Sequence, residues 1–207
     1  MIAFPPQAVV FDMDGVILDS FEANIAYYNF VSLGLGLGEL NRHAQQVVHR
    51  ETHVNALKHI AGEKRFQEAL DLSRQYKARQ LQKNHSLFPQ GLETIARLSK
   101  KVPLAVGTNR DHSTYSILHE LEVMDFFGLV VTPSDAPAPK PAAVFMEYLL
   151  GKLGYKPDQV VYIGDSLVDQ LLCDNAGVRL LAFRNPELSA WRHVEEFARI
   201  PEALGFN

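Results

Sequence analysis

The sequence predicts an α/β protein: a doubly wound parallel sheet with an inserted, all-helical cap domain. Two observations carry this prediction. Short apolar runs of strand length alternate with helical patterns along most of the chain, and one long stretch near the N-terminus holds helical patterns alone. Alternating strands and helices are typical of a parallel sheet with helices on both faces. A block of helices directly after the first strand indicates an insertion.

Five apolar runs are predicted to form the strands of the sheet. Most of them lack strict alternation of apolar and polar residues, as expected for parallel strands that are buried on both faces. Turn residues or charged residues bound each run. The five runs are AVVF at 8–11, LAVGT at 104–108, GLVVT at 128–132, VVYIG at 160–164 and RLLAF at 179–183.

Helical patterns fill the spaces between these runs, and their ends carry start and stop signals. GLETIARLSKK follows Pro89, SILHELEVMDFFG ends in Gly128, and PAAVFMEYLLGKLG begins at Pro141 and stops at Gly154. Proline is favoured in the first turn of a helix, and glycine is favoured just after its end. Ligands of such sheets bind outside the carboxyl ends of the strands, so we expect the functional residues there.

The stretch 19–86 contains no convincing strand, and we expect it to form a separate helical domain. Its helical patterns are separated by GLGLG at 34–38 and by Gly62, since glycine interrupts helices. We therefore predict a core domain made of 1–18 and 87–207, with 19–86 as a helical cap over the ligand edge of the sheet.

Composition and charge argue against several classes of protein. The 207 residues are 47% hydrophobic, with a formal net charge of −4, so a basic surface for nucleic acid is not expected. No apolar run approaches the roughly 18 residues of a membrane span, and MIAFPPQ does not resemble a signal peptide. The single cysteine, Cys173, suits a reducing compartment. We expect a cytoplasmic monomer or homodimer that binds neither nucleic acid nor membrane.

Two pairs of aspartates stand at predicted carboxyl ends of strands. Asp12 and Asp14 follow the first strand, and Asp165 and Asp169 follow VVYIG. Two carboxylates held this close together repel each other, and burial at the end of a strand raises the cost of ionising either one. A bound cation is the simplest compensation. A carboxylate cluster without histidine or cysteine favours Mg²⁺ over zinc. The sequence therefore predicts a magnesium site.

Three other ligand motifs do not fit. A calcium loop that began at Asp12 would place Ile17 at position six and Ala23 at position twelve, where glycine and glutamate are needed. GLGLG follows a helical pattern, so it is not a dinucleotide fingerprint. HRETH at 49–53 has its glutamate one place too late for a zinc-protease helix.

Two further strand ends add groups that suit a phosphate. Thr108 and Asn109 close LAVGTN with a hydroxyl and an amide, and Lys140 in APKPAA adds a positive charge. An aspartate that attacks a phosphoryl dianion needs such a charge, because the two anions repel each other. Arg110 follows Asn109 and either extends the phosphate site or lies on the surface.

These motifs together resemble a known family. DMDGVILDS, VGTN, KP and GDSLVD, in this order and at these spacings, resemble the four motifs of the haloacid dehalogenase superfamily, specifically its phosphatase-like members with a helical cap. The resemblance covers nearly the whole chain. It implies a Rossmann-like core and a Mg²⁺-dependent phosphoric monoester hydrolase, which acts on a small phosphorylated metabolite through an aspartyl-phosphate.

The resemblance also implies roles for the aspartates. Asp12 would be the nucleophile, and Asp14 the general acid that later serves as the base. Mg²⁺ would be held by the Asp12 carboxylate, the Asp14 backbone carbonyl and Asp165. Asp169 would orient Lys140 or a metal-bound water. Dehalogenases of the superfamily lack an aspartate at the position of Asp14, so its presence favours phosphoryl transfer.

The remaining implied residues contact the substrate. Thr108 and Lys140 would bind the transferring phosphoryl group, and Asn109 lies beside them. In the cap, VVHRETH at 47–53 resembles the corresponding loop of beta-phosphoglucomutase and offers Arg50 as a substrate contact. Gln46-Val47 replaces Lys-Gly of that enzyme, which weakens the alternative of a phosphomutase. A non-catalytic regulatory subunit is the other alternative.

Overall fold

The computed structural model describes the chain except residues 1–4, 20, 52, 80–85, 111–112 and 207. The chain divides into two compact units: a core unit, Met1–Asp19 with His85–Asn207, and a helical unit, Ser20–Asn84. The sequence places these boundaries at 18/19 and 86/87. That the helical unit acts as a cap stays a prediction.

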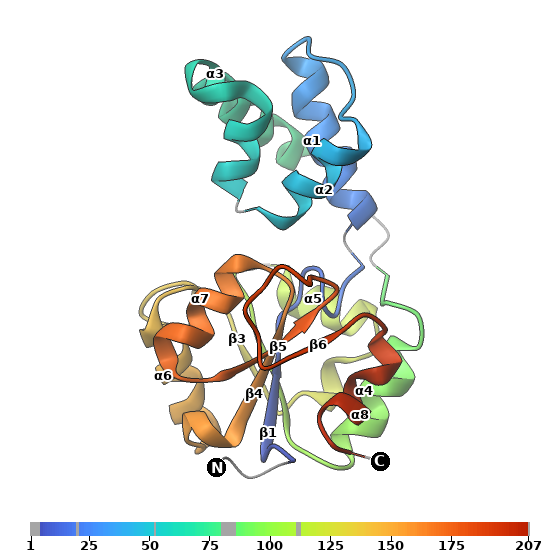
Figure 1. Ribbon diagram of the computed structural model, residues 1–207, viewed down its shortest axis with the longest axis vertical. Coiled ribbons are helices and arrows are strands. Elements are labelled where there is room, and N and C mark those ends of the chain that lie inside the picture. Colours follow the sequence, from blue (N-terminus) through green and yellow to red (C-terminus); the bar gives the residue numbers. More distant parts are fainter. Residues whose placement is uncertain (1–4, 20, 52, 80–85, 111–112, 207) are drawn as a thin grey trace. The chain divides into compact units, whose positions relative to one another are not determined.

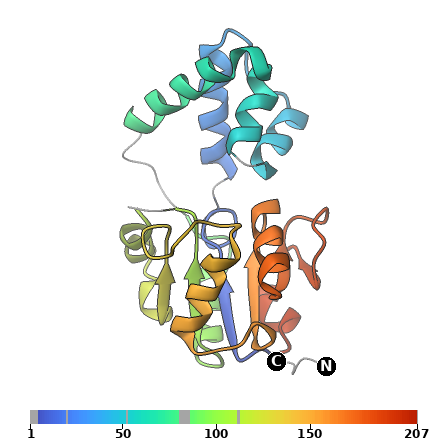
Figure 2. The same ribbon diagram turned by 90° about the vertical axis from the view of Figure 1, so that its left-hand side faces the viewer.

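The core unit contains a six-stranded parallel sheet, which confirms the predicted fold class. Its strand order is β3-β2-β1-β4-β5-β6, and every neighbouring pair is parallel. Figure 2 shows the strands side by side, with β1 in blue near the centre. The strands are β1 (Ala8–Phe11), β2 (Leu104–Gly107), β3 (Leu129–Val131), β4 (Val160–Gly164), β5 (Arg179–Phe183) and β6 (Arg192–Val194).

The strand order places a topological switch between β1 and β4. The chain runs outward from β1 through β2 to β3 and then returns to β4 on the other side of β1. The connections on the two sides leave β1 and β4 in opposite directions, and ligands of such sheets bind at the carboxyl ends of the two strands at this switch point.

Alternate residues of β1 belong to two apolar layers on the two faces of the sheet. Val9 and Phe11 belong to one cluster of buried side chains, whereas Ala8 and Val10 belong to the other. The first cluster includes residues of α4 (Gly91–Ser99), α5 (Thr114–Glu120) and α8 (Ile200–Ala203). The second includes residues of α6 (Ala143–Leu153) and α7 (Leu167–Ala176). Figure 1 shows α6 and α7 on one side of the sheet, and α4 and α8 on the other.

Two elements differ from the prediction. The helix expected over SILHELEVMDFFG ends at Glu120, and a short 3-10 helix, η1 (Met124–Phe126), follows it. Glu122 lies between them with a φ of 57°, a left-handed conformation that an α-helix does not contain. Strand β6 was not predicted, because its sequence RHV has two exposed residues and no apolar run. Two more 3-10 helices complete the unit, η2 (Pro157–Gln159) and η3 (Phe197–Arg199).

The helical unit has its own apolar core. Its helices are α1 (Phe21–Gly34), α2 (Arg42–Arg50) and α3 (His53–Arg79), and they bury a cluster that includes Ile25, Val31 and Leu57. Gly62 interrupts α3 with a φ of 68°, as the sequence predicts. Among the described residues, none of the helices combines the length and the apolarity that crossing a membrane requires.

Candidate active site

Three aspartate side chains meet at the carboxyl ends of β1 and β4. Asp12 follows β1, Asp165 follows β4, and Asp169 lies in the first turn of α7. Because β1 pairs with β4, with Phe11 opposite Ile163, the residues after these strands are neighbours. One carboxylate oxygen from each aspartate lies within 4.8 Å of the others. The structure thus brings together three of the four aspartates that the sequence singles out.

Lys140 lies among these carboxylates as a buried ammonium group. Its Nζ is 2.8 Å from Asp12 Oδ1 and 2.7 Å from Asp169 Oδ1. The same Nζ donates a hydrogen bond of 2.9 Å to the Tyr162 hydroxyl. The lysine side chain is 3% exposed, which is rare for lysine unless it is paired. Lys140 therefore supplies the positive charge that the sequence predicts, directly beside Asp12.

Asn109 holds the backbone of Lys140 in place. Its side-chain Nδ2 donates to the Lys140 carbonyl at 2.9 Å, and its Oδ1 accepts from the Lys140 amide at 2.8 Å. Both ends of the Asn109 amide are therefore used within the protein, and its predicted contact with substrate stays a prediction. Thr108 is buried beside it at the end of β2, and its Oγ1 accepts from the Arg110 amide at 3.0 Å.

Asp169 connects the start of α7 to Lys140. Its Oδ2 accepts from the hydroxyl of Ser166 at 2.6 Å, and Ser166 in turn caps the helix. Its Oδ1 faces Lys140. Gly164 leaves room for this arrangement, because a Cβ at that position would lie 2.4 Å from the Asp169 Cβ. The glycine before Asp165 is thus a packing requirement of the site.

Tyr162 is a site residue that the sequence analysis missed. It is fully buried in β4, and its hydroxyl donates to the Gly107 carbonyl at 2.6 Å while it accepts from Lys140. A buried tyrosine needs a hydrogen-bond partner for its hydroxyl. A tyrosine inside the apolar run VVYIG therefore indicated a buried polar contact at this strand. Tyr162 ties β2, β4 and Lys140 together.

Asp165 is positioned by close packing and by a second residue that the sequence analysis missed. Gly15 has a φ of 78°, and a Cβ there would lie 2.0 Å from Asp165 Oδ2, so the turn after β1 requires glycine for both reasons. Asn185 Nδ2 donates to the Asp165 carbonyl at 2.8 Å. Asn185 is buried just after β5. Its place after a strand was the only feature of the sequence that could have marked it as a site residue.

Asp14 forms an ion pair with Arg110. Arg110 Nε is 2.9 Å from Asp14 Oδ2, and Nη2 is 2.5 Å from Oδ1. Arg110 Nη1 also donates to the Ser113 hydroxyl at 3.1 Å. Burial lowers the pKa of Arg110, but the Asp14 carboxylate raises it more, and the net shift is upward. The sequence analysis placed Arg110 either in the phosphate site or on the surface, and neither alternative included Asp14 as its partner.

The electrostatics of the cluster show an excess of negative charge. Burial, with repulsion from Asp169, raises the pKa of Asp12 to about 7 although Lys140 opposes the shift. Burial and the same neighbours raise the pKa of Asp165 well above its usual value. Burial lowers the pKa of Lys140, but the Asp12 and Asp169 carboxylates outweigh burial and raise it overall. One lysine therefore does not balance three carboxylates.

The cluster fits a hard divalent cation. Among the described residues, Asp12 Oδ1 is buried and makes no hydrogen bond, because Lys140 approaches it at 2.8 Å outside hydrogen-bond geometry. A buried carboxylate oxygen without such a partner is costly. The donor set consists of oxygens, which suits Mg²⁺.

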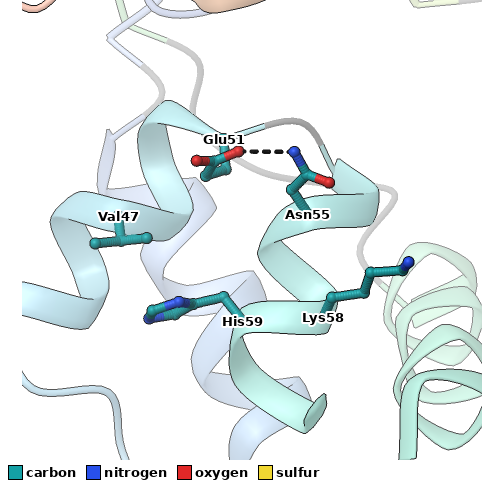
Figure 3. A pocket seen from close by; sticks show the side chains of 5 residues that line it. All are labelled: Val47, Glu51, Asn55, Lys58 and His59. Atoms are coloured by element: carbon teal, nitrogen blue, oxygen red, sulfur yellow. Dashed lines mark hydrogen bonds between the residues drawn. The ribbon is translucent and has the colours of Figure 1, made fainter. Parts of the chain in front are cut away.

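The helical unit has a groove of its own, which among the described residues is lined only by residues of that unit. Figure 3 shows its lining residues, and Glu51 Oε2 accepts a hydrogen bond of 2.9 Å from the Asn55 amide there. The predicted contact residue Arg50 is the last residue of α2, and its side chain lies outside the described part. The groove has a volume of about 320 Å³ and is lined by Val47, Glu51, Asn55, Lys58 and His59.

Comparison with known proteins gives consistent similarities. The family model of haloacid dehalogenase-like hydrolases matches residues 9–183. A Yersinia pseudotuberculosis protein named phosphoglycolate phosphatase is 26% identical over 83% of this chain and 78% of that protein. A haloacid dehalogenase superfamily hydrolase of subfamily IA from Geobacter sulfurreducens has a TM-score of 0.75, with 29% identity over 99% of both chains. A haloacid dehalogenase-like family hydrolase from Streptococcus pneumoniae shares the fold, with a TM-score of 0.81, 21% identity and coverage of 96% and 98%.

Proposed function

The chain belongs to the haloacid dehalogenase-like hydrolases, in their phosphatase branch, and we propose that it hydrolyses a small phosphate monoester with Mg²⁺. The match to the family model over residues 9–183 confirms the resemblance found in the sequence. One observation supports the chemistry above all: Lys140 Nζ lies 2.8 Å from Asp12 Oδ1, within a cluster of carboxylates. Relatives named phosphoglycolate phosphatase favour 2-phosphoglycolate, or a phosphate ester of similar size and charge, as the substrate.

In the first proposed step, a carboxylate oxygen of Asp12 attacks the phosphorus atom. The bond between phosphorus and the leaving oxygen breaks, and Asp14 donates its proton to that oxygen. The product is an aspartyl-phosphate on Asp12. The Asp12 carboxylate loses its charge in this step, the phosphoryl group keeps its own two negative charges, and the balancing charge appears on Asp14, which has given up its proton. Lys140 lies beside Asp12, so its ammonium group can stabilise the carboxylate before the step and the attached phosphoryl group after it.

In the second step, water attacks the phosphorus of the aspartyl-phosphate. Asp14 takes a proton from the water, and the bond between phosphorus and Asp12 breaks. Inorganic phosphate leaves, Asp12 is again a carboxylate, and Asp14 is again protonated, so the cycle closes. Thr108 has its hydroxyl at the end of β2, where it can bind a phosphoryl oxygen in both steps.

Three groups would hold the metal ion: the carboxylates of Asp12 and Asp165, and the backbone carbonyl of Asp14. When it is bound, Mg²⁺ supplies positive charge that attracts the phosphoryl group and offsets the repulsion among the carboxylates. Asp169 orients Lys140. The helical unit is proposed to act as the cap that selects the substrate, with Arg50 as a contact to its polar end.

Hydrolysis of 4-nitrophenyl phosphate and 2-phosphoglycolate tests this function. We expect both esters to be hydrolysed with Mg²⁺, activity to disappear with EDTA, and Asp12→Asn to reduce kcat by at least about 1,000-fold. The control is Asp174→Asn, which removes an exposed carboxylate from α7 and should leave the rate unchanged. Activity that survives Asp12→Asn, or that needs no metal, contradicts the proposal.

A further inference from the structure

The ion pair between Asp14 and Arg110 is not explained by the proposed reaction. Both Asp14 oxygens face the guanidinium group, at 2.9 Å and 2.5 Å. A carboxylate held by two charge-assisted hydrogen bonds is strongly bound, whereas a general acid must be free to approach the leaving oxygen. The guanidinium has to give up Asp14 during the cycle, and a second anion is the ligand that can replace it.

Arg110 is built as a fixed anion-binding fork. Its amide donates to Thr108 Oγ1 at 3.0 Å, its carbonyl accepts from Thr114 Oγ1 at 2.9 Å, and its Nη1 donates to Ser113 Oγ at 3.1 Å. These contacts hold the backbone and one end of the guanidinium. The side chains of Arg110 and Asp14 are 30% and 37% exposed, so a ligand from solvent can reach the pair.

The position of the fork follows from the role of Asp14. The general acid must lie next to the bond between the phosphorus and the leaving group, because it protonates the oxygen of that bond. Arg110 contacts the carboxylate of Asp14 directly, so it lies on the leaving-group side of the reaction centre. A planar guanidinium binds carboxylates in a two-pronged manner, which is how it already binds Asp14.

We propose that Arg110 recognises an anionic leaving group, whose carboxylate replaces that of Asp14 on the guanidinium. The exchange binds the substrate and frees the Asp14 carboxylate, which then takes up a proton from solvent and can donate it to the leaving oxygen. This inference rests on the proposed function and narrows it: the enzyme prefers small phosphate monoesters that carry a carboxylate near the ester oxygen, and Arg110 is the residue that determines this preference.

A pair of matched esters tests the inference. 2-Phosphoglycolate carries a carboxylate where 2-hydroxyethyl phosphate carries a hydroxymethyl group, and 4-nitrophenyl phosphate reports on the chemistry without either group. The variants are Arg110→Gln, which removes the charge, and Arg110→Lys, which keeps the charge but not the fork. Arg199→Gln is the control, because Arg199 is exposed and paired with Glu202.

We expect wild type to prefer 2-phosphoglycolate over 2-hydroxyethyl phosphate in kcat/KM. Arg110→Gln should reduce kcat/KM for 2-phosphoglycolate about 10- to 100-fold more than for 2-hydroxyethyl phosphate, mainly through KM, and Arg110→Lys should give an intermediate loss. The control, Arg199→Gln, should leave kcat/KM unchanged for both esters. The wild-type preference itself is a test even where a variant folds poorly.

The outcomes separate the two proposals. Equal losses for both esters, or a wild type without preference for the carboxylate, overturn the role of Arg110 but leave the phosphatase intact. If wild type with Mg²⁺ hydrolyses none of the three esters, the proposed function is overturned, and Arg110 then has no leaving group to select.

Discussion

At the scale of single residues, Lys140 is the residue on which the site depends most. An ammonium group has three N–H donors, and Asp12, Asp169 and Tyr162 all lie within 2.9 Å of its Nζ. Hydrogen bonds to Asp169 and Tyr162 use two of these donors. The third lies on the side of Asp12, where a phosphoryl group attached to Asp12 can accept from it.

Replacing Lys140 should damage both stability and activity. Lys140→Met leaves two buried carboxylates without their cation, and we expect the free energy of unfolding to fall by about 3 to 5 kcal/mol and kcat by at least about 100-fold. Urea unfolding and steady-state kinetics measure the two effects. Lys152→Met, at an exposed position of α6, is the control; equal stability of the two variants would refute the account of Lys140.

Replacing Asp165 should stabilise the metal-free protein. The folded state raises the pKa of Asp165, so at any pH above the unfolded-state pKa the carboxyl group is harder to ionise in the folded protein than in the unfolded chain, which opposes folding. A neutral side chain of the same shape removes this cost. We expect Asp165→Asn to have a higher free energy of unfolding than wild type in EDTA, and to lose the increase in Tm that Mg²⁺ gives wild type.

Thermal unfolding in EDTA and in Mg²⁺ measures both parts of this prediction. A variant that is less stable than wild type in EDTA would show that repulsion at Asp165 does not oppose folding, and a variant that keeps the full Mg²⁺ effect would show that Asp165 is not a metal ligand.

The charged residues of the site were predictable, but their supports were not. Asp12 and Asp165 directly follow strands, Lys140 lies in the loop between β3 and α6, and all three belong to motifs that have a chemical meaning. Tyr162 lies inside an apolar run, where the pattern marks it only as buried. Asn185 depends on a contact with Asp165, which lies 20 residues earlier, and no local pattern reports such a contact.

At the scale of elements, the start of α7 is the part of the fold that joins stability to the site. Ser166 caps this helix and donates to Asp169 at 2.6 Å, and Asp169 holds Lys140. The strands themselves were predictable, because β1, β2, β4 and β5 are continuous apolar runs. Strand β6 was not, because its short sequence RHV has two exposed residues and one buried apolar residue, too few for a recognisable pattern.

Removing the cap should loosen Asp169. Ser166→Ala deletes the hydroxyl that bonds Asp169, and we expect a loss of about 1 kcal/mol in unfolding free energy together with a several-fold fall in kcat. Ser99→Ala is the control, because the Ser99 hydroxyl donates only to the carbonyl of Ala96 in its own helix at 3.0 Å. Similar effects of both substitutions on kcat would contradict a link between the cap and the site.

At the scale of the whole molecule, the fold gathers residues that are far apart in sequence. Asp12, Thr108, Lys140 and Asp165 come from four separate segments. The parallel sheet brings the ends of β1, β2 and β4 to one edge, and the loop between β3 and α6 adds Lys140 there. The helical unit is inserted between the first of these segments and the others. The sequence predicts this division from the absence of strands in 19–86, whereas the action of the helical unit as a cap depends on how it meets the substrate.

The central claim is that this edge transfers a phosphoryl group to Asp12, and trapping the intermediate tests it most directly. Enzyme that is turning over 2-phosphoglycolate with Mg²⁺ is quenched in acid and reduced with borohydride, which converts an aspartyl-phosphate to homoserine. Mass spectrometry of the peptides then locates the change. The account predicts homoserine at position 12, only when both substrate and Mg²⁺ are present. Homoserine at another aspartate, or rapid turnover with Asp12 unmodified throughout, would contradict it.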